Sequence, residues 1–491
     1  MSNQRHIVVV GGGTAGWMAA NLLVRRWPSD QVKVTLVESP KIGTIGVGEG
    51  STPAMRRFFE LIDVADSDWM PQCKATYKVG IRFDGWSREG GVAQYRHPFF
   101  SQPDTFAHRA FLTNCRTRRL GLSVKTQPDA FFLNAQLAKD RLAPITPPNF
   151  PFHVDYGYHF DAGRLGRFLS ELGVSRGVNH VRANILEARR DAHGDIAELV
   201  TDIDEPITGD FFIDCSGFAA VLMHKTLGVG FESFADGLFN DAAVVLPGPA
   251  QEAPVTETVS TALSAGWRWR IPLTHRYGNG YVYSSQFLSA DQAETELRSA
   301  LGDTDGRHEA RHLKMRIGQS AKHWHKNCLA LGLSQGFLEP LEATALLLVQ
   351  VTLERFMAHY ESTDMQCARH GEFNADIRQR FDGVRDYIVA HYKLNTRTDS
   401  DYWIAARDNP SLSDALRELL EAWYRREDIS PIVERHYATS HFNTLSWHCL
   451  LAGYGAFPPL ADDQPGRGDL FVDQNVAAFM QGCALNFSPP A

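Results

Sequence analysis

The first forty residues strongly constrain how this chain can fold, because they contain the parts of a dinucleotide-binding unit in order. Ile7–Val10 is an all-apolar run, typical of a strand buried on both faces. It leads into a G-x-G-x-x-G pattern at residues 11–16, which a helical pattern follows. A second strand pattern at 32–37 ends at Glu38, whose carboxylate is placed to accept ribose hydroxyls. This order predicts that the N-terminal part binds a dinucleotide.

Each small residue of this loop has its own predicted role. Gly11 permits the tight turn, Gly13 lets the backbone approach a pyrophosphate, and Gly16 lets the helix pack closely on the strand. The helix then begins near Thr14 and Ala15, where free N–H groups and the helix dipole favour phosphate. The loop alone does not separate FAD from NAD.

Later segments favour FAD. Gly48 and Glu49 belong to a second glycine-rich loop, and strand patterns at 210–214 and 327–331 each end in a small-residue turn, the latter at Gly332. Several strand ends that are far apart in sequence and return to one cofactor suit an extended FAD. We therefore expect an α/β, Rossmann-like FAD-binding fold of the flavin monooxygenase type.

The domain organisation follows from the same patterns. We expect residues 1–335 to form a discontinuous FAD-binding α/β region, with 60–150 inserted and contributing to the active site. Helical periodicity at 345–357 and 412–423 predicts that 336–491 is a mainly helical substrate-binding region. The stretch after Phe457 reads as a Pro-rich, polar tail.

Composition excludes several classes of function. The 491 residues carry a net charge of -8 and no dense Lys/Arg block, so a nucleic-acid partner is not expected. Seven scattered cysteines without a C-x-x-C pair fit a reducing cytoplasm. The N-terminus has no apolar signal region, and no apolar stretch approaches the ~20 residues of a membrane span. We expect a cytoplasmic protein without a membrane partner.

A short run in the middle of the chain points to a particular kind of flavin protein. In Gly266–Pro272, two tryptophans two residues apart on a strand face the same side, and the arginines between them face the other. The proline ends the run. Two indoles on one surface of a flavin protein can block the space where other flavin enzymes admit substrate.

With other motifs, this run resembles the tryptophan-halogenase group of the flavin-dependent halogenases. The resemblance spans most of the chain, and its further motifs are G-G-G-T-A-G-W at 11–17, G-V-G-E at 46–49, K-V-G-I-R-F at 78–83, H-P-F at 97–99, Y-H-F-D-A at 158–162, I-D-C-S-G-F at 213–218, G-Y-V-Y-S-S at 280–285 and G-F-L-E-P-L-E-A-T at 336–344.

The resemblance implies a reaction and its partners. A separate NAD(P)H-dependent flavin reductase supplies reduced FAD, which with O2 and chloride or bromide gives hypohalous acid. This oxidant crosses a tunnel and halogenates an electron-rich small aromatic, such as indole, by electrophilic substitution. The alternative enzyme is a flavin-dependent monooxygenase of an aromatic substrate, against which the paired tryptophans argue. A non-catalytic flavoprotein is a third reading, and a homodimer is left open.

The resemblance also assigns catalytic residues. Lys78 matches the catalytic lysine, which either polarises hypohalous acid as an ammonium or captures the halogen as an amine. Glu342 matches the second catalytic residue, which either stabilises the cationic intermediate and removes the ring proton or orients the oxidant. Glu339 is the competing carboxylate. Halide binding is implied at the backbone N–H groups of Thr344 and Ala345, where glycine is common at the second position.

The substrate pocket departs from the family pattern. Phe99 is expected to stack on an aromatic substrate, with His97 at the rim. Relatives that take free tryptophan carry a Tyr-Tyr pair and a glutamate late in the chain, which align near residues 430–431 and Tyr437. A family tryptophan falls on Phe442, which we expect at the substrate. Without the ammonium-binding carboxylate, free tryptophan is expected to be a poor substrate.

One metal motif needs an alternative explanation. His308–His312 fits H-E-x-x-H, the helix pattern of zinc proteases. The stretch is very polar, lacks a third ligand at a recognised spacing and lies outside every matched motif. We therefore expect no metal site.

Overall fold

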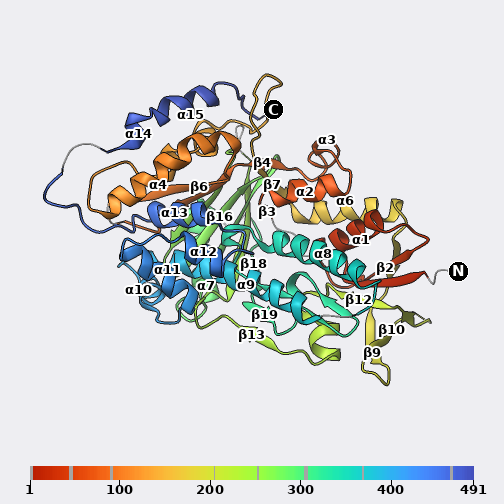
Figure 1. Cartoon of the computed structure of the whole chain (residues 1–491). Helices are drawn as coiled ribbons and strands as arrows, with labels where there is room; N and C mark the ends of the chain where they lie inside the picture. The colour runs from red at the N-terminus through yellow and green to blue at the C-terminus, as the bar shows by residue number, and fades with distance from the viewer. Residues whose placement is uncertain are drawn as a thin grey trace.

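The structure is a computed structural model that describes residues 4–43, 48–88, 92–203, 205–250, 254–303, 308–367, 370–464 and 468–490. Two large sheets run through the centre, with helices around them (Figure 1). Helices α1, α2, α6 and α8 lie near the N-terminus, α9 packs against α8, and helices α10 to α15 lie on the other side of the molecule.

The first sheet is the predicted nucleotide-binding sheet, and its order is β20-β21-β12-β1-β2-β8. The five strands from β21 to β8 are parallel, and β20 is an antiparallel edge strand. This confirms the α/β fold, with β1 between two partners from distant parts of the sequence. The strands are β20 (Trp324–His325), β21 (Cys328–Ala330), β12 (Phe211–Asp214), β1 (Arg5–Val10), β2 (Val32–Glu38) and β8 (Asn179–Arg182).

The second sheet carries the paired tryptophans, and its order is β18-β14-β17-β16-β15-β5-β6. Trp267 and Trp269 are buried on one face of β16, with ring centroids 6.2 Å apart, and the alternating arginines at 268 and 270 are partly exposed, as expected. The strands are β18 (Arg311–Lys314), β14 (Ala242–Pro249), β17 (Arg276–Tyr283), β16 (Gly266–Pro272), β15 (Thr258–Leu263), β5 (Gly80–Asp84) and β6 (Gln94–Pro98).

A small sheet, β3-β7-β4, links two loops that the sequence separates. His159 in β7 pairs with Gly50 in β3 on one side and with Thr76 in β4 on the other. The strands of this and the other small sheets are β3 (Gly48–Gly50), β4 (Thr76–Lys78), β7 (Gly157–Asp161), β9 (Ile185–Arg190), β10 (Ile196–Thr201), β11 (Ile207–Thr208), β13 (Phe231–Ser233), β19 (Gly318–Ser320) and β22 (Gly336–Phe337).

The chain after residue 344 is helical up to Gly453 apart from its connections, which confirms the predicted helical region. The predicted helices at 345–357 and 412–423 correspond to α8 and α11, and the Ser413 side chain caps α11. The division at residue 335 stays a prediction. These helices are α8 (Ala345–Ser362), α9 (His370–Lys393), α10 (Asp401–Asp408), α11 (Asp414–Tyr424), α12 (Ser430–His436) and α13 (Thr444–Gly453).

The interpretation of the tail as merely polar is wrong, because its apolar residues form two further helices. Phe471 packs at 5.0 Å from the ring of Phe131, and Val476 and Met480 are buried. These helices are α14 (Leu470–Asp473) and α15 (Val476–Ala484), which pack on α4 (Thr105–Arg119) and α5 (Leu133–Asp140). The remaining α-helices are α1 (Thr14–Arg26), α2 (Ala54–Leu61), α3 (Asp66–Trp69), α6 (Ala162–Ser175) and α7 (Ala290–Leu301).

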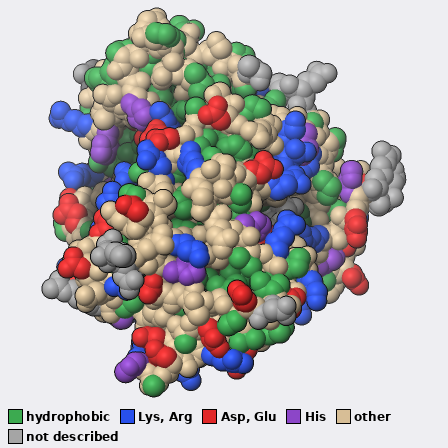
Figure 2. All heavy atoms as spheres, turned by 90° about the vertical axis from the view of Figure 1, so that its right-hand side faces the viewer, with side chains coloured by type: hydrophobic (Ala, Val, Ile, Leu, Met, Phe, Trp, Pro, Cys, Tyr) green, Lys and Arg blue, Asp and Glu red, His purple; other side chains and the backbone are tan. Residues whose placement is uncertain are grey.

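Two further observations concern the surface and the H-E-x-x-H stretch. Acidic and basic side chains are interspersed over the face near the N-terminus (Figure 2). None of the described helices is long and apolar enough to cross a bilayer. His312 lies in strand β18 and hydrogen-bonds Glu294 at 2.8 Å, so the stretch does not form the helix that a zinc protease requires.

Candidate active site

The glycine loop between β1 and α1 is shaped by steric contacts that only glycine allows. Gly11 has φ +117°, and a Cβ there would overlap the carbonyl of Cys215. A Cβ on Gly16 would overlap the Gly11 carbonyl, so helix and strand approach closely, as predicted. At Gly13 an added Cβ would meet no atom within 4 Å, so its backbone faces open space.

The surrounding residues complete a cradle that fits the pyrophosphate and ribose of FAD. No side chain caps α1, which leaves its first N–H groups, at Thr14 and Ala15, for a ligand. Gly332 has φ +66° and approaches Ala15 too closely for a side chain. Glu38 lies beside the loop and hydrogen-bonds His180 at 2.9 Å.

The second glycine-rich loop is described only from Gly48 onward; residues 46 and 47 of the G-V-G-E motif lie outside the described residues. Gly48 packs against the backbone of Gly278, since a Cβ would lie 3.3 Å from its Cα. Glu49 is its neighbour in β3. Burial and the charge of Asp161 raise the pKa of Glu49 to about 7. The motif therefore places a readily protonated carboxyl group in this loop.

Lys78 ends β4 as a fully buried amine. Its side chain is 0% exposed, and within the described part of the chain Nζ has no hydrogen-bond partner. Nζ lies 5.4 Å from the ring centroid of Phe99. Burial lowers the pKa of Lys78 to about 7, although the charge of Glu342 acts in the opposite direction. The local pattern, which alone would indicate a solvated strand edge, is misleading here.

Glu342 is the carboxylate whose charge acts on Lys78. It is 6% exposed, and Oε1 accepts a 2.8 Å hydrogen bond from Nε2 of His391. Nδ1 of His391 in turn contacts the Tyr454 hydroxyl at 2.9 Å. Burial acts to raise the pKa of Glu342, but the His391 hydrogen bond and the charges of His391, His97 and Lys78 lower it overall. The arrangement favours an ionised carboxylate with Oε2 free of His391.

Glu339, the competing carboxylate, has a different environment. Its Oε2 accepts hydrogen bonds from Asn240, from the indole N–H of Trp267 at 3.0 Å and from the Tyr392 hydroxyl. Burial raises the pKa of Glu339. The side chain is thus tied to β16 and α9, whereas Glu342 faces the lysine, a distinction that the sequence alone could not make.

Aromatic and imidazole rings surround this pair. Phe99 is half-buried, whereas His97 is only 7% exposed and lies inside the protein, not at a rim. The Tyr387 hydroxyl lies 3.4 Å from Nδ1 of His97. Phe442 stacks face to face on Tyr387, with centroids 3.6 Å apart. One face of Phe442 is therefore already covered by protein.

The predicted halide residues lie at the start of α8, directly after Glu342. Ala343 has φ +55°, Thr344 is the N-cap residue, and Ala345 is the first helical residue. No side chain caps the helix, and the first N–H groups of a helix lack intrahelical acceptors. Thr344 is buried, but Ala345 is exposed. This geometry suits a small anion at the helix start.

The positions that align with the amino-acid clamp of tryptophan-using relatives contain no acidic group. Residues 430–431 begin α12, with Pro431 exposed to solvent. Tyr437 is buried, and its hydroxyl donates to Asp386 at 3.0 Å, so it belongs to a separate contact between α9 and α12. No group of three or more His, Cys, Asp or Glu side chains suited to a metal ion occurs among the described residues.

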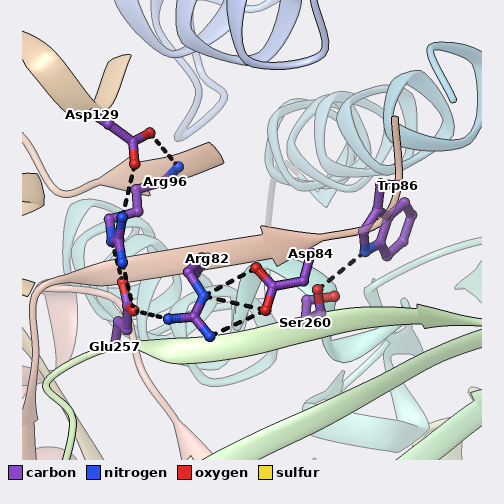
Figure 3. Close-up of polar contacts among 7 residues, drawn as sticks. All are labelled: Arg82, Asp84, Trp86, Arg96, Asp129, Glu257 and Ser260. Carbon is purple, nitrogen blue, oxygen red and sulfur yellow. Dashed lines mark hydrogen bonds and ion pairs between the residues drawn. The ribbon is translucent and has the colours of Figure 1, made fainter. Parts of the chain in front are cut away.

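An ionic network around the buried Glu257, missed in the sequence, holds the strands next to the site (Figure 3). Arg82 and Arg96 are cross-strand partners in β5 and β6, and Glu257 bonds both of them, at 2.9 and 2.8 Å. Asp84 and Asp129 complete the network. Because Glu257 precedes β15 and Arg96 precedes His97, the network fixes strands that carry site residues. A single arginine in each of β5 and β6, flanked by buried residues, was the available signal.

Comparison with known proteins shows similarity over most of the chain. The family model described as tryptophan halogenase matches residues 6–465. The 7-chloro-L-tryptophan 6-halogenase KtzR of Kutzneria sp. (strain 744) is 38% identical over 480 residues, which cover 92% of this chain and 90% of the relative.

Solved structures agree over nearly the whole chain. The crystal structure of tryptophan 6-halogenase SttH from Streptomyces toxytricini matches with a TM-score of 0.86 and 33% identity, over 99% of this chain and 98% of that one. The flavin-dependent halogenase BrvH from Brevundimonas sp. BAL3 matches with a TM-score of 0.80 and 32% identity, over 98% and 96%.

Proposed function

Because this chain belongs to the tryptophan halogenase family, and is a flavin-dependent halogenase, we propose that it halogenates an electron-rich aromatic without an amino-acid tail, such as indole. One observation carries the choice of substrate. The carboxylate whose charge acts on Lys78 is Glu342, and the groups whose charges lower its pKa, His391, His97 and Lys78, are all basic. A substrate ammonium would therefore compete for the one catalytic carboxylate.

Backbone groups and two acidic residues would hold the cofactor. When bound, reduced FAD with O2 and halide supplies hypohalous acid, and a separate NAD(P)H-dependent reductase supplies the reduced flavin. The residues that would hold FAD are Gly11, Gly13, Thr14, Ala15, Gly16, Glu38, Gly48, Glu49 and Gly332. The N–H groups of Thr344 and Ala345 would hold chloride or bromide near the start of α8.

Lys78 acts on the oxidant and Glu342 acts on the aromatic ring. A protonated Lys78 polarises hypohalous acid by hydrogen bonding, which makes the halogen more electrophilic. The ring then attacks the halogen and becomes cationic, while the O–X bond breaks and its oxygen takes a proton from Lys78 and leaves as water. Ionised Glu342 stabilises that cation and accepts the ring proton, on Oε2, because His391 occupies Oε1. Phe99 stacks on the substrate, and His97 and Phe442 line the pocket behind it.

A competition experiment tests the substrate assignment. The purified protein is given FAD, a flavin reductase, NADH, O2 and bromide, with indole and free tryptophan at equal concentrations. We expect mono-halogenated indole to exceed halogenated tryptophan by at least about ten-fold, since a missing charge-assisted clamp costs about 1.5–3 kcal/mol. Equal or greater halogenation of tryptophan would contradict the proposal.

A further inference from the structure

The unpaired amine of Lys78 faces a small space that a glycine leaves free. A Cβ added to Gly50 would lie 3.3 Å from Lys78 Nζ, 3.3 Å from Thr258 Oγ1 and 3.5 Å from the His159 ring. The three side chains therefore border the space in front of Gly50, which is partly accessible. Nζ nevertheless has no hydrogen-bond partner among the described residues, so it does not bond Thr258 directly.

Hydrogen bonds behind this space fix which atoms donate and which accept. The Thr76 hydroxyl donates to the carbonyl of Pro272 at 2.8 Å, because a carbonyl can only accept. Its hydrogen is thereby used, so Thr76 Oγ1 accepts from Nδ1–H of His159, 3.2 Å away. Burial, together with the charge of Lys78, holds the pKa of His159 well below its usual value. His159 is therefore neutral and carries its proton on Nδ1.

The protonation of His159 determines the direction of its hydrogen bond with Thr258. A neutral His159 with a proton on Nδ1 has a lone pair on Nε2, and this atom lies 2.9 Å from Thr258 Oγ1. The Thr258 hydroxyl therefore donates to His159 and keeps its lone pairs for other donors. The space at Gly50 is thus bordered by one buried donor, Lys78 Nζ, and one buried acceptor, Thr258 Oγ1.

A donor and an acceptor that do not touch each other suit a small molecule that can accept from one and donate to the other. A molecule of the form H–O–X does both, since its oxygen accepts from the ammonium and its hydrogen goes to the hydroxyl oxygen. An unsatisfied buried amine is costly unless such a ligand is present. With the hydroxyl end held at Gly50, X is left to face Phe99, the expected substrate wall.

We propose that Lys78 Nζ and Thr258 Oγ1 form a two-point binding site for a neutral H–O–X molecule, which is water in the resting enzyme and hypohalous acid in turnover. Thr258 is then a second oxidant-binding residue, and His159 and Thr76 are positioning residues that orient its lone pair. Gly50 keeps the site open. The identity of the ligand in turnover rests on the proposed function, whereas the water site does not.

Substitutions at Thr258 test the site, because they should change how much hypohalous acid reaches indole and how much escapes into solution. Thr258→Val keeps the shape and removes the hydroxyl, Thr258→Ser keeps the hydroxyl, and Thr261→Val is a matched control on the opposite face of β15. Reactions contain bromide and an enolisable diketone in excess, which captures hypohalous acid that escapes. Halogenated indole, captured halogen and consumed O2 are measured together.

We expect Thr258→Val to lower halogenated indole about ten-fold and to raise the captured fraction, at unchanged O2 consumption, because one hydrogen bond to the oxidant is lost. Thr258→Ser should stay within about three-fold of the natural protein, and Thr261→Val should not differ from it. Unchanged indole halogenation in Thr258→Val, or a serine variant as defective as the valine variant, would overturn the assignment of Thr258.

Crystal structures without substrate provide a readout that does not depend on activity. We expect an ordered water within hydrogen-bonding distance of both Lys78 Nζ and Thr258 Oγ1 in the natural protein, and its loss in Thr258→Val. The absence of this water from the natural protein would overturn the binding site even if halogenation is normal. A protein that produces neither halogenated indole nor captured halogen would instead contradict the proposed function, and the water would still test the site.

Discussion

Two buried clusters of charge lie close together in this protein, and they differ in how completely they are paired. In the network of Arg82, Arg96 and Glu257, each charged group has an ionic partner at hydrogen-bonding distance. Lys78 has none among the described residues, although it is fully buried and both arginines are partly exposed. Paired charges hold the strands in register, whereas the unpaired amine is kept at a cost in stability. We infer that this cost is tolerated for chemistry.

The comparison is tested most severely by removing the unpaired amine. We expect Lys78→Met to lower halogenation by about 1,000-fold or more, because the group that polarises the oxidant is lost. FAD binding should be unchanged, since Lys78 is not part of the glycine cradle. LC–MS of halogenated indole and a flavin-binding titration measure the two effects, and Lys33→Met, at an exposed lysine of β2, is the control.

The same variant should be more stable than the natural protein. Folding lowers the pKa of Lys78 from 10.5 to about 7, so the unfolded chain binds the proton more tightly. Stability of the natural protein therefore falls as pH drops from 10.5 to about 7 and is then constant. Lys78→Met should raise Tm by about 2 °C or more at pH 7 and by less near pH 10. A lower Tm at pH 7 would show that the amine is paired.

Removing the shared anion of the paired network should have the opposite effect. Glu257→Gln removes the anion that Arg82 and Arg96 share and leaves each arginine with one partly exposed aspartate, so we expect a loss of about 3 kcal/mol in the free energy of unfolding. Urea denaturation measures it. Glu198→Gln, in an ion pair with an Arg189 that is 54% exposed, should cost less than about 1 kcal/mol. Equal effects would refute the distinction between these pairs.

The two carboxylates of the segment before α8 also differ in that one is held by structural contacts and the other has a proposed role in the chemistry. Glu342→Gln should slow turnover about 100-fold with little change in stability, since its role is at the substrate. Glu339→Gln should reduce stability by about 1–3 kcal/mol, because Trp267 and Tyr392 lose a charged acceptor, and should slow turnover less. Steady-state kinetics and urea denaturation measure turnover and stability in both variants. A larger loss of turnover in Glu339→Gln than in Glu342→Gln would show that Glu339 is the catalytic carboxylate.

The smallest expected effect concerns the residue that holds Glu342. His391→Asn removes a hydrogen bond that lowers the pKa of Glu342, so this pKa should rise. In the proposed mechanism Glu342 acts as an ionised base, so activity should be lost as pH falls through its pKa. The acid limb of the pH–kcat profile should move to higher pH, with about a three-fold loss at the optimum. His312→Asn is the control, and an unmoved acid limb would exclude His391 from this role.

Local sequence was sufficient to predict the cofactor cradle but not the catalytic chamber. The turn at Gly11 and the contact at Gly16 depend on neighbours within a few residues and on one returning strand. The burial of Lys78 depends on β7 and on the Phe99 loop, which the alternation in β4 cannot encode. Lys78 and Glu342 were identified through the family resemblance, and only the contacts of His391 and Trp267 separate Glu342 from Glu339.

Other features could not be predicted from the sequence because they also depend on contacts between distant segments. The Glu257 network joins β5, β6 and the start of β15, so its pairing appears only when the sheet order is known. The tail seemed polar because its apolar residues are spaced between prolines and acids. Phe471 and Met480 nevertheless anchor it against α4 and α5. His97 was expected at a rim, but it is buried in β6 beside Tyr387 of α9, a contact between residues 290 positions apart.

Titration of the Lys78 amine tests the central claim most directly, namely that this group is buried without a protein partner. The protein is labelled with lysine carrying 13C at Cε, and the Lys78 resonance is assigned from its absence in Lys78→Met. We expect this resonance to titrate with a midpoint at about pH 7. A midpoint above about pH 9, in the range of an ordinary solvated lysine, would contradict the claim.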